Sequence, residues 1–383
     1  MSKAQKVLIS GVWRDSDAVD TFEPDNPTTR QATGEVYPVS GEAEVMEAIE
    51  AAAEASEALQ SFYPHGVASF LEEFADRIEA RADELVAMAH AESGLPAPTR
   101  LAAIELPRTT GQLRLAAAAA RAGSWSVPTI DTASNIRSMY RALDGAIAVF
   151  GPNNFPFAFN SVAGGDFAAA LGAGCPVIGK ANSSHPGTSR LLAEEALEAL
   201  KATGLPLATV QLIYRTDHAV GARLVSHEKI GATGYTGSRS AGLTLKAAAD
   251  AAGKPIYLEL SSINPVYILP GALEERSEAI ADEFGTSCLM GTGQFCTNPG
   301  IIVLLKGDRT DRFIEQVKER FDATPVGTLL ARGVETGLSL SVEALQQAGA
   351  QLLTGGTAGV GTGFSYSNTL LQATAADFLR APE

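Results

Sequence analysis

Between residues 145 and 260, short apolar runs alternate with longer segments whose apolar residues recur at helical spacing. The runs AIAVFG, CPVIGK, TVQLIY, KIGATGYTGS and PIYLEL are candidate strands, and helices are expected between them, for example over residues 240–252. Strands that alternate with helices of this length indicate a parallel sheet covered on both faces. The pattern therefore predicts an α/β fold with a doubly wound sheet, whose ligands bind at the carboxyl ends of the strands.

The flanking segments predict a helical layer before this region and a second α/β domain after it. Residues 42–60 and 67–92 are rich in Ala, Glu and Leu at helical spacing. After Leu260 come a helix over residues 273–289, a glycine-rich loop, the strand IIVLLKG and a helix from Arg312 to Phe321. The segment SMYRALD at residues 138–144, with the polar alternating residues before it, suggests a hairpin arm.

Composition narrows the class of protein. The chain has 383 residues, of which 45% are hydrophobic and 19% charged, as in a soluble protein with a sizeable core. Its 44 acidic and 29 basic side chains give a net charge of -15, and no cluster of Lys and Arg stands out, so we expect no nucleic-acid partner. The amino terminus has only a short apolar run, and no window approaches about eighteen consecutive apolar residues. We therefore expect a cytoplasmic protein without a secretory signal or a membrane span.

Two glycine motifs of nucleotide-binding proteins are incomplete or missing. The segment from Gly174 to Ala181 nearly fits a P-loop, but the residues between its glycines are strand-like, and Ala181 replaces the hydroxyl that binds magnesium. The Gly-x-Gly-x-x-Gly fingerprint does not follow any predicted strand. The pattern thus favours a doubly wound sheet without the standard Rossmann cofactor geometry.

The three cysteines, Cys175, Cys288 and Cys296, have neither zinc-site nor disulfide spacing, so no metal is expected. Cys296 lies in the glycine-rich segment 291–300, where small residues let a ligand approach and expose backbone amides beside the sulfur. Such amides help to lower the pKa of a thiol, as a nucleophile requires. The alternative is an inert buried cysteine, which residue type alone favours.

Four motifs, in family order along the chain, resemble signatures of the aldehyde dehydrogenase superfamily. They are Gly151-Pro-Asn-Asn-Phe-Pro156, Gly234-Tyr-Thr-Gly-Ser238, Leu258-Glu-Leu260 and Gly293-Gln-Phe-Cys-Thr297. Within the superfamily, the chain resembles the branch of NADP-dependent 2-oxoglutarate semialdehyde (2,5-dioxovalerate) dehydrogenases. That similarity lies in Phe159-Asn-Ser-Val-Ala-Gly-Gly-Asp166, Ser184-His-Pro-Gly-Thr-Ser189 and Ser261-Ser-Ile-Asn-Pro265.

The resemblance implies a division into domains. Residues 1–124 and 145–260 would form a cofactor-binding domain, residues 125–144 an oligomerisation arm, and residues 261–383 a catalytic domain. Family members continue with a Glu-x-Phe-Gly-Pro motif that is absent here, so the catalytic domain is expected to be truncated. Homo-oligomers are expected of the full-length family.

By the same resemblance, the Cys296 thiolate attacks the carbon of a small aldehyde, and the oxyanion accepts hydrogen bonds from the side chain of Asn154 and the amide of Cys296. Glu259 then deprotonates the water that hydrolyses the thioester. Its place in the apolar run PIYLEL predicts a buried carboxylate with a raised pKa. From residue type alone, Asn154 is equally a turn asparagine, and Glu259 a solvent-facing glutamate at a strand end.

The resemblance also implies a nicotinamide cofactor. Lys180 matches a lysine that binds the cofactor ribose, and Ser238 lies at a helix start whose amides favour a pyrophosphate. Ser183 stands where many NAD-using relatives have a glutamate that binds the ribose hydroxyls. The missing carboxylate removes repulsion against a 2′-phosphate, so NADP is expected, with NAD as the alternative. The other cofactor-binding candidates are Pro152, Gly237, Leu260 and Arg215, with His218 as a further phosphate contact.

The expected function is the oxidation of 2-oxoglutarate semialdehyde to a carboxylic acid through a thiohemiacetal and a thioester. Phe155, Phe159 and Phe295 are candidates for the wall of the aldehyde tunnel, although aromatic residues beside apolar helices are more often core. A carboxylate-bearing aldehyde needs a cation near the tunnel mouth, and the sequence singles out none. One alternative is a truncated chain that binds nucleotide or associates with intact subunits without efficient catalysis. Another is a cofactor-independent esterase that uses the same Cys and Glu.

Overall fold

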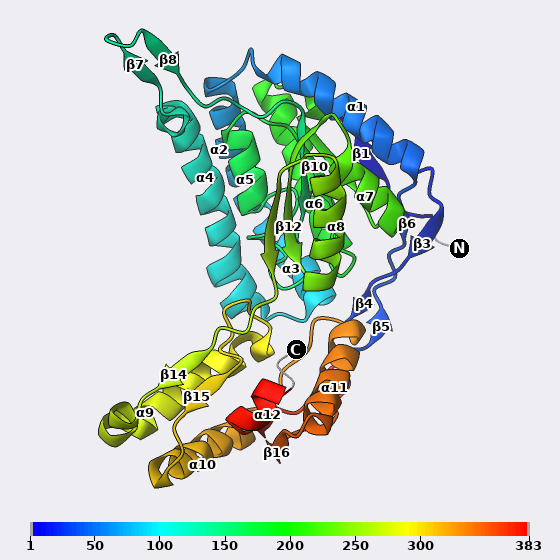
Figure 1. Ribbon diagram of the computed structural model, residues 1–383. Helices are drawn as coiled ribbons and strands as arrows, with labels where there is room; N and C mark the ends of the chain where they lie inside the picture. Colours follow the sequence, from blue (N-terminus) through cyan, green and yellow to red (C-terminus); the bar gives the residue numbers. More distant parts are fainter. Residues whose placement is uncertain (1–2, 381–383) are drawn as a thin grey trace. The chain divides into compact units, whose positions relative to one another are not determined.

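The computed structural model describes residues 3–380, which divide into two compact units (Figure 1). Unit 1 comprises the residues up to Pro24 and Ala32–Leu260, and unit 2 comprises Asp25–Gln31 and the residues from Ser261 onward. Within residues 3–380, none of the helices combines the length and the apolar character that crossing a membrane requires.

A seven-stranded sheet forms the centre of unit 1 among the described residues, in the order β13-β12-β9-β10-β11-β1-β2. Its strands are β1 (Val7–Ile9), β2 (Val12–Arg14), β9 (Ala146–Phe150), β10 (Val177–Lys180), β11 (Val210–Ile213), β12 (Ile230–Gly237) and β13 (Ile256–Leu260). The strands from β9 to β13 are parallel, as the alternation of strands and helices predicts. In the segment with P-loop-like spacing, residues Val177–Lys180 form β10 and not a phosphate-binding loop.

The strand order reverses beside β9. The chain moves outward from β9 through β10 to β11, then returns to place β12 on the other side of β9. Val149 pairs with Gly234 and Phe150 with Tyr235 across this junction. All five residues of β9 are buried, because helices cover both faces of the sheet. In doubly wound sheets, ligands bind outside the carboxyl ends of the strands at such a switch point.

The sequence pattern does not predict the far edge of the sheet. β1 pairs antiparallel with β11, with Leu8 opposite Leu212, and β2 pairs antiparallel with β1. Each of these amino-terminal strands has only three residues, and the partner of β1 lies about 200 residues away along the chain. Three residues are too few to show a strand periodicity, and the local sequence does not indicate a partner so far along the chain.

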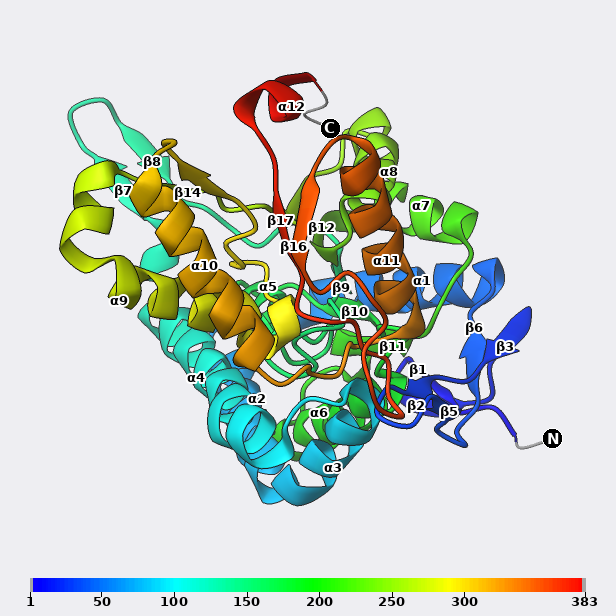
Figure 2. The ribbon, with the colours of Figure 1, turned by 90° about the horizontal axis from the view of Figure 1, so that it is seen from below.

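Helices pack on both faces of the sheet in unit 1. The helices and turns are α1 (Glu42–Leu59), α2 (His65–Ala80), α3 (Ala82–Ser93), the π-helix η1 (Ala97–Glu105), α4 (Leu106–Ala122), η2 (Ser124–Ser126), α5 (Gly165–Gly172), α6 (Pro186–Thr203), η3 (Leu207–Thr209), α7 (His218–Ser226) and α8 (Arg239–Ala251). In Figure 2, α2 and α6 lie on one side of β9–β11, and α1, α7 and α8 lie on the other.

The segment of helical spacing at residues 67–92 forms two helices. The backbone at Arg81 leaves the helical region, with φ -103° and ψ 16°, and separates α2 from α3. The guanidinium of Arg81 binds Glu84 in α3 and Glu194 and Glu195 in α6. These tertiary contacts stabilise a break that the helical spacing does not indicate.

An exposed hairpin lies within the predicted arm at residues 125–144. It pairs β7 (Thr129–Asp131) with β8 (Ile136–Ser138), and every residue of both strands is exposed. Two further pairs of short strands occur near the amino terminus, namely β3 (Asp20–Phe22) with β6 (Tyr37–Val39), and β4 (Asp25–Asn26) with β5 (Gln31–Ala32).

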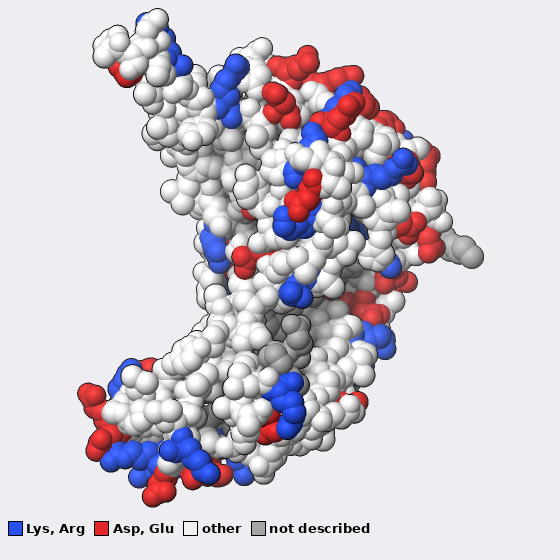
Figure 3. All heavy atoms as spheres, in the orientation of Figure 1, with Lys and Arg blue, Asp and Glu red and all other residues white. Residues whose placement is uncertain are grey.

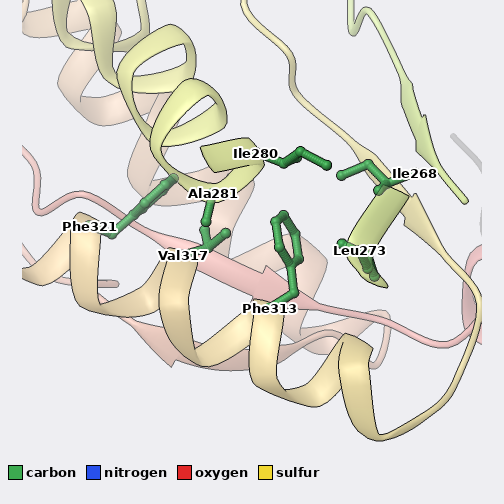
Figure 4. Packing of buried hydrophobic residues seen from close by; sticks show 7 residues of the cluster. All are labelled: Ile268, Leu273, Ile280, Ala281, Phe313, Val317 and Phe321. Carbon is green, nitrogen blue, oxygen red and sulfur yellow. The ribbon is translucent and has the colours of Figure 1, made fainter. Parts of the chain in front are cut away.

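Unit 2 has its own hydrophobic core. Its elements are β14 (Val266–Ile268), α9 (Pro270–Leu289), η4 (Met290–Gly293), β15 (Ile302–Leu304), α10 (Asp308–Ala323), α11 (Arg332–Gln347), β16 (Gln351–Thr354), β17 (Leu370–Gln372) and α12 (Ala375–Arg380). Phe313, Val317 and Phe321 of α10 pack against Ile280 and Ala281 of α9 (Figure 4). β14 and β15 pair in parallel.

Charged side chains of both signs are interspersed over the face of the molecule that Figure 3 shows. Many charged side chains of the described residues form surface ion pairs, such as Arg114 with Glu79 and Arg121 with Glu72. A broad part of this face, between its upper right and its lower left, carries few charged side chains (Figure 3).

Candidate active site

The candidate residues of unit 1 follow the carboxyl ends of the five parallel strands. Lys180 is the last residue of β10, Gly237 of β12 and Leu260 of β13, with Glu259 just before it. Pro152 and Asn154 follow β9, and Arg215 follows β11. Parallel strands end at one edge of the sheet, so the fold brings together at this edge candidates that lie up to about 110 residues apart along the chain.

Two side chains from the segment after β10 hold the loop after β9. The side-chain amide of Asn182 donates to the Gly151 carbonyl at 3.0 Å. His185 Nε2 donates to the Pro152 carbonyl at 2.8 Å, which requires the tautomer with a proton on Nε2. Burial lowers the pKa of His185, so its imidazole is neutral at pH 7. The branch motif around His185 thus has a structural role in this loop.

A buried carboxylate, which sequence reasoning missed, holds the Asn154 segment from the other side. Glu105 Oε1 accepts hydrogen bonds from the amides of Phe157 and Ala158 at 2.8 and 3.1 Å. Its Oε2 binds Arg100 at 2.7 Å, and Arg100 also donates to the Asn154 carbonyl at 3.4 Å. Burial raises the pKa of Glu105, while the charge of Arg100 and the two amides oppose that shift.

Phe155 and Phe159, two candidates for the substrate tunnel, are in contact within unit 1. Their ring centroids lie 5.0 Å apart, and the rings meet edge to face at 77°. Both side chains are only partly buried, unlike the neighbouring Phe157. They therefore leave ring surface exposed directly after Asn154.

Lys180 is an amine that burial has made easier to deprotonate. Burial, together with the charge of Arg215, lowers the pKa of Lys180 to about 8. Among residues 3–380, no carboxylate lies within 4.0 Å of its Nζ. Arg215 is exposed beyond the end of β11, and Ser183 is half-buried in the turn where the Ser184 amide donates to Asn182. Two cations at one sheet edge favour an anionic or hydroxyl-rich ligand.

The start of α8 offers unfilled backbone donors. Ser238 is its N-cap residue, with extended backbone angles, and its side chain makes no capping hydrogen bond. The first amides of a helix lack partners within the helix, and they bind phosphate groups readily. Gly237 lies close to Tyr235, whose hydroxyl would be 2.7 Å from a Cβ at position 237. His218 is the first residue of α7 and is exposed. The cations and this helix start fit a ligand that carries phosphates.

The prediction that Glu259 is buried in apolar surroundings is wrong. Glu259 is exposed, as is Tyr257, because β13 is the edge strand and its burial alternates along the strand. An apolar run alone does not separate an edge strand from a central one. The Glu259 carboxylate contributes to raising the pKa of Asp166 in α5, for which burial is the larger cause. Sequence reasoning assigned no role to Asp166.

In unit 2, hydrogen bonds hold the loop of Cys296 in place. The carbonyl of Cys296 accepts from Ser262 Oγ at 2.6 Å and from Asn264 Nδ2 at 2.7 Å. The side chain of Asn298 donates to the Cys288 carbonyl at 2.6 Å. Cys296 itself is half-buried, so its sulfur is not the inert, fully buried thiol of the alternative interpretation. Cys175, by contrast, is buried, and burial raises the pKa of its thiol to about 11.

The chain upstream of Cys296 adopts a backbone conformation that side chains rarely take. Gly291, Thr292 and Gly293 all have φ between 60° and 72°. Glycine adopts this left-handed backbone conformation without strain, whereas it is strained for a β-branched residue such as threonine. Gln294 then bridges two parts of unit 2, since its Nε2 donates to the Thr328 carbonyl and its Oε1 accepts from the Leu330 amide at 2.9 Å. Phe295, the remaining tunnel candidate, is half-buried in the same loop.

The sequence model of the aldehyde dehydrogenase family matches residues 13–381. The chain belongs to the aldehyde dehydrogenase family. The resemblance seen in four motifs is thereby confirmed for nearly the whole chain. It is 42% identical over 309 residues to alpha-ketoglutaric semialdehyde dehydrogenase 2 of Azospirillum brasilense, covering 78% of this chain and 58% of that protein.

A second relative has a similar name. The alpha-ketoglutaric semialdehyde dehydrogenase of Acinetobacter baylyi is 38% identical over 335 residues, covering 85% of this chain and 63% of that protein. This family member therefore spans about three fifths of the length of these two relatives.

Solved structures confirm the fold of this family member. Aldehyde dehydrogenase C of Pseudomonas syringae, solved as a mutant with NAD+ and octanal, has a TM-score of 0.85 at 21% identity and covers 98% of this chain and 76% of its own. An aldehyde dehydrogenase of Bacillus cereus in complex with NAD+ has a TM-score of 0.83 at 21% identity, covering 98% of this chain and 76% of its own.

Proposed function

We propose that this protein oxidises an aldehyde to a carboxylic acid with a nicotinamide cofactor. The observation that carries the proposal is the set of candidates at the carboxyl edge of the sheet in unit 1, in a chain that belongs to the aldehyde dehydrogenase family. Unit 1 would bind the cofactor, and unit 2 would supply the nucleophile Cys296.

The proposed reaction begins when the Cys296 thiolate attacks the aldehyde carbon and forms a thiohemiacetal. The side-chain amide of Asn154 and the backbone amide of Cys296 would donate to the developing oxyanion, and Glu105 and Arg100 hold the Asn154 segment from outside. The nicotinamide, when bound, supplies the hydride acceptor. Glu259 would then take a proton from water, which attacks the thioester and releases the acid and the Cys296 thiolate.

The exposure of Glu259 suits this last role. A general base must reach water, and it must lose its proton again to solvent after each turnover. Desolvation, and after it the charge of Glu259, raises the pKa of Asp166 in α5.

For the cofactor, we propose that the edge residues bind its phosphates and riboses. Lys180 would bind a ribose hydroxyl, the amides at the start of α8 would bind the pyrophosphate beside Ser238 and Gly237, and Pro152 and Leu260 would line the site. Ser183 introduces no negative charge after Lys180, and Arg215 lies at the same sheet edge. A 2′-phosphate would therefore meet cations there, which favours NADP over NAD.

For the substrate, we propose 2-oxoglutarate semialdehyde, with Phe155, Phe159 and Phe295 around its carbon chain. Two relatives at 42% and 38% identity are named for this aldehyde under its alternative name, alpha-ketoglutaric semialdehyde. The exposed ring surface of Phe155 and Phe159 beside Asn154 supports an apolar wall at this place.

A steady-state assay of NADPH formation with 2-oxoglutarate semialdehyde tests the proposal. Cys296→Ser is expected to abolish turnover, whereas Cys288→Ser, in the same unit, should retain it. Glu259→Gln should keep the initial acylation, seen as a burst of NADPH, and slow the steady state at least about 10-fold. A wild-type chain that binds NADP in calorimetry but oxidises no aldehyde would contradict the proposal. Ester hydrolysis without cofactor, lost in Cys296→Ser, would point to the esterase instead.

A further inference from the structure

Two arginines surround the aromatic pair that follows Asn154. The guanidinium carbon of Arg100 lies 4.4 Å from the ring centroid of Phe155. That of Arg108 lies 5.7 Å from the centroid of Phe155 and 5.0 Å from that of Phe159. All four residues belong to unit 1, and cations within about 6 Å of an aromatic ring are attracted to its face.

The two arginines differ in what balances their charge. Arg100 is mostly buried and forms an ion pair with Glu105, whose side chain is fully buried. Both oxygens of Glu105 are already engaged, one by Arg100 and the other by the amides of Phe157 and Ala158. Burial raises the pKa of Glu105, and the charge of Arg108 only opposes that rise, because the two side chains form no direct ion pair.

Arg108 is exposed in the first turn of α4, and no carboxylate within residues 3–380 lies within 4.0 Å of its guanidinium. Many other arginines of this acidic chain have such a partner, including Arg114 and Arg121 on the same helix. Contact with the two rings limits the freedom of the Arg108 side chain, so less entropy is lost when it binds an anion.

We infer that Arg108 binds the carboxylate of a substrate that carries an aldehyde at one end and a carboxylate at the other. The planar guanidinium can donate two parallel hydrogen bonds to a carboxylate, while the rings of Phe155 and Phe159 contact the carbon chain between the two ends. This inference rests on the proposed function, because it takes Asn154 as the place where the aldehyde oxygen binds. It adds the specificity residue that distinguishes an acidic aldehyde from an uncharged one.

The test compares 2-oxoglutarate semialdehyde with pentanal, an uncharged aldehyde that also has five carbons. In Arg108→Gln, the ratio of kcat/KM for the acidic aldehyde to that for pentanal is expected to fall about 10- to 100-fold, through KM rather than kcat. Arg108→Lys keeps the charge but not the paired donors, and should lose less. Arg121→Gln removes the same charge from α4 roughly 20 Å along the helix and should leave the ratio unchanged.

A ratio in Arg108→Gln equal to that of wild type overturns the inference, as does an equal loss with both aldehydes. If the wild-type chain oxidises neither aldehyde, the proposed function fails. Whether Arg108 binds a carboxylate can still be tested by measuring ligand binding. Calorimetric titration with 2-oxoglutarate would then show an affinity that Arg108→Gln weakens about 10-fold or more and Arg121→Gln does not. Absent or unchanged binding of 2-oxoglutarate overturns the inference by that route.

Discussion

Glu92 is a fully buried carboxylate that joins α3 to the start of α6. Its Oε1 accepts from the Gly187 amide at 2.7 Å, and its Oε2 accepts from the amide and the hydroxyl of Thr188, both at 2.8 Å. These bonds favour the ionised form, but desolvation exceeds them and raises the pKa of Glu92 to about 7. The carboxylate thus replaces a local capping residue at the helix that follows the Ser183 turn.

The raised pKa makes stability depend on pH. With a pKa near 4.5 when unfolded and about 7 when folded, Glu92 keeps its proton only in the folded state between these values. The free energy of unfolding should therefore fall as pH rises from about 5 to 7, by up to roughly 1.4 kcal/mol per pH unit from this group. Glu92→Gln should flatten that slope. Urea unfolding at several pH values measures the slope of the unfolding free energy against pH. Equal slopes in the wild type and in Glu92→Gln would refute the role given to Glu92.

Ser183 provides a residue-scale prediction about the cofactor. A glutamate at this position would place a negative charge where we propose that the 2′-phosphate of NADP binds. Ser183→Glu should therefore raise the KM for NADP at least about 10-fold relative to that for NAD. Ser183→Gln, similar in size and uncharged, is the control for bulk. Cofactor binding by calorimetry gives the same comparison without turnover, and an unchanged preference would place the 2′-phosphate elsewhere.

At the scale of elements, β10 is packed closely against the segment before α5. A Cβ on Gly179 would lie 2.3 Å from Val162 Cγ1 and 3.0 Å from the Ser161 carbonyl. Gly179→Ala must push that segment away from the sheet, and we expect a loss of about 1–3 kcal/mol in unfolding free energy.

Gly111, in the interior of α4, is the matched control for Gly179. A Cβ there meets nothing within 4 Å, and glycine costs a helix about 0.5–1 kcal/mol relative to alanine. Gly111→Ala should therefore stabilise the protein by about that amount. Thermal unfolding of the two variants should give melting temperatures that move in opposite directions, and a shift in the same direction would contradict the packing argument.

At the scale of the whole molecule, each unit has a core of its own. Phe313 is buried at the centre of the cluster between α9 and α10, whose members all belong to unit 2. Phe313→Ala should cost about 3–5 kcal/mol through lost burial and the cavity left behind. Phe378 in α12, which is 49% exposed, is the control, and its replacement by Ala should change stability by less than about 0.5 kcal/mol.

Amide hydrogen exchange locates the effect of Phe313→Ala. The amides of α9 and α10 should exchange faster, while those of β9–β11 in the core of unit 1 keep their protection, because regions with separate cores can open separately. Equal acceleration in both units would show that they unfold as one.

Much of the sheet was predictable, because β9, β10 and β11 are short, mostly apolar runs whose residues are nearly all buried. The break at Arg81 and the pairing of β1 with β11 were not, because both depend on partners more than 100 residues away. For the site, motif order pointed to Cys296, Asn154 and Glu259. Glu105 and Arg108 gave no signal, because Glu and Arg in helical segments are expected at the surface.

The fold class, the family and the identity of the candidate site residues follow from the amino-acid sequence alone, because they depend on local periodicity and on motifs of a few residues. The environments of those residues, by contrast, depend on the three-dimensional packing of the chain. This packing placed Glu259 on an exposed edge strand, lowered the pKa of Lys180 and brought Arg108 against Phe155 and Phe159. Burial and electrostatic coupling depend on which distant segments pack together, and no local pattern contains that information.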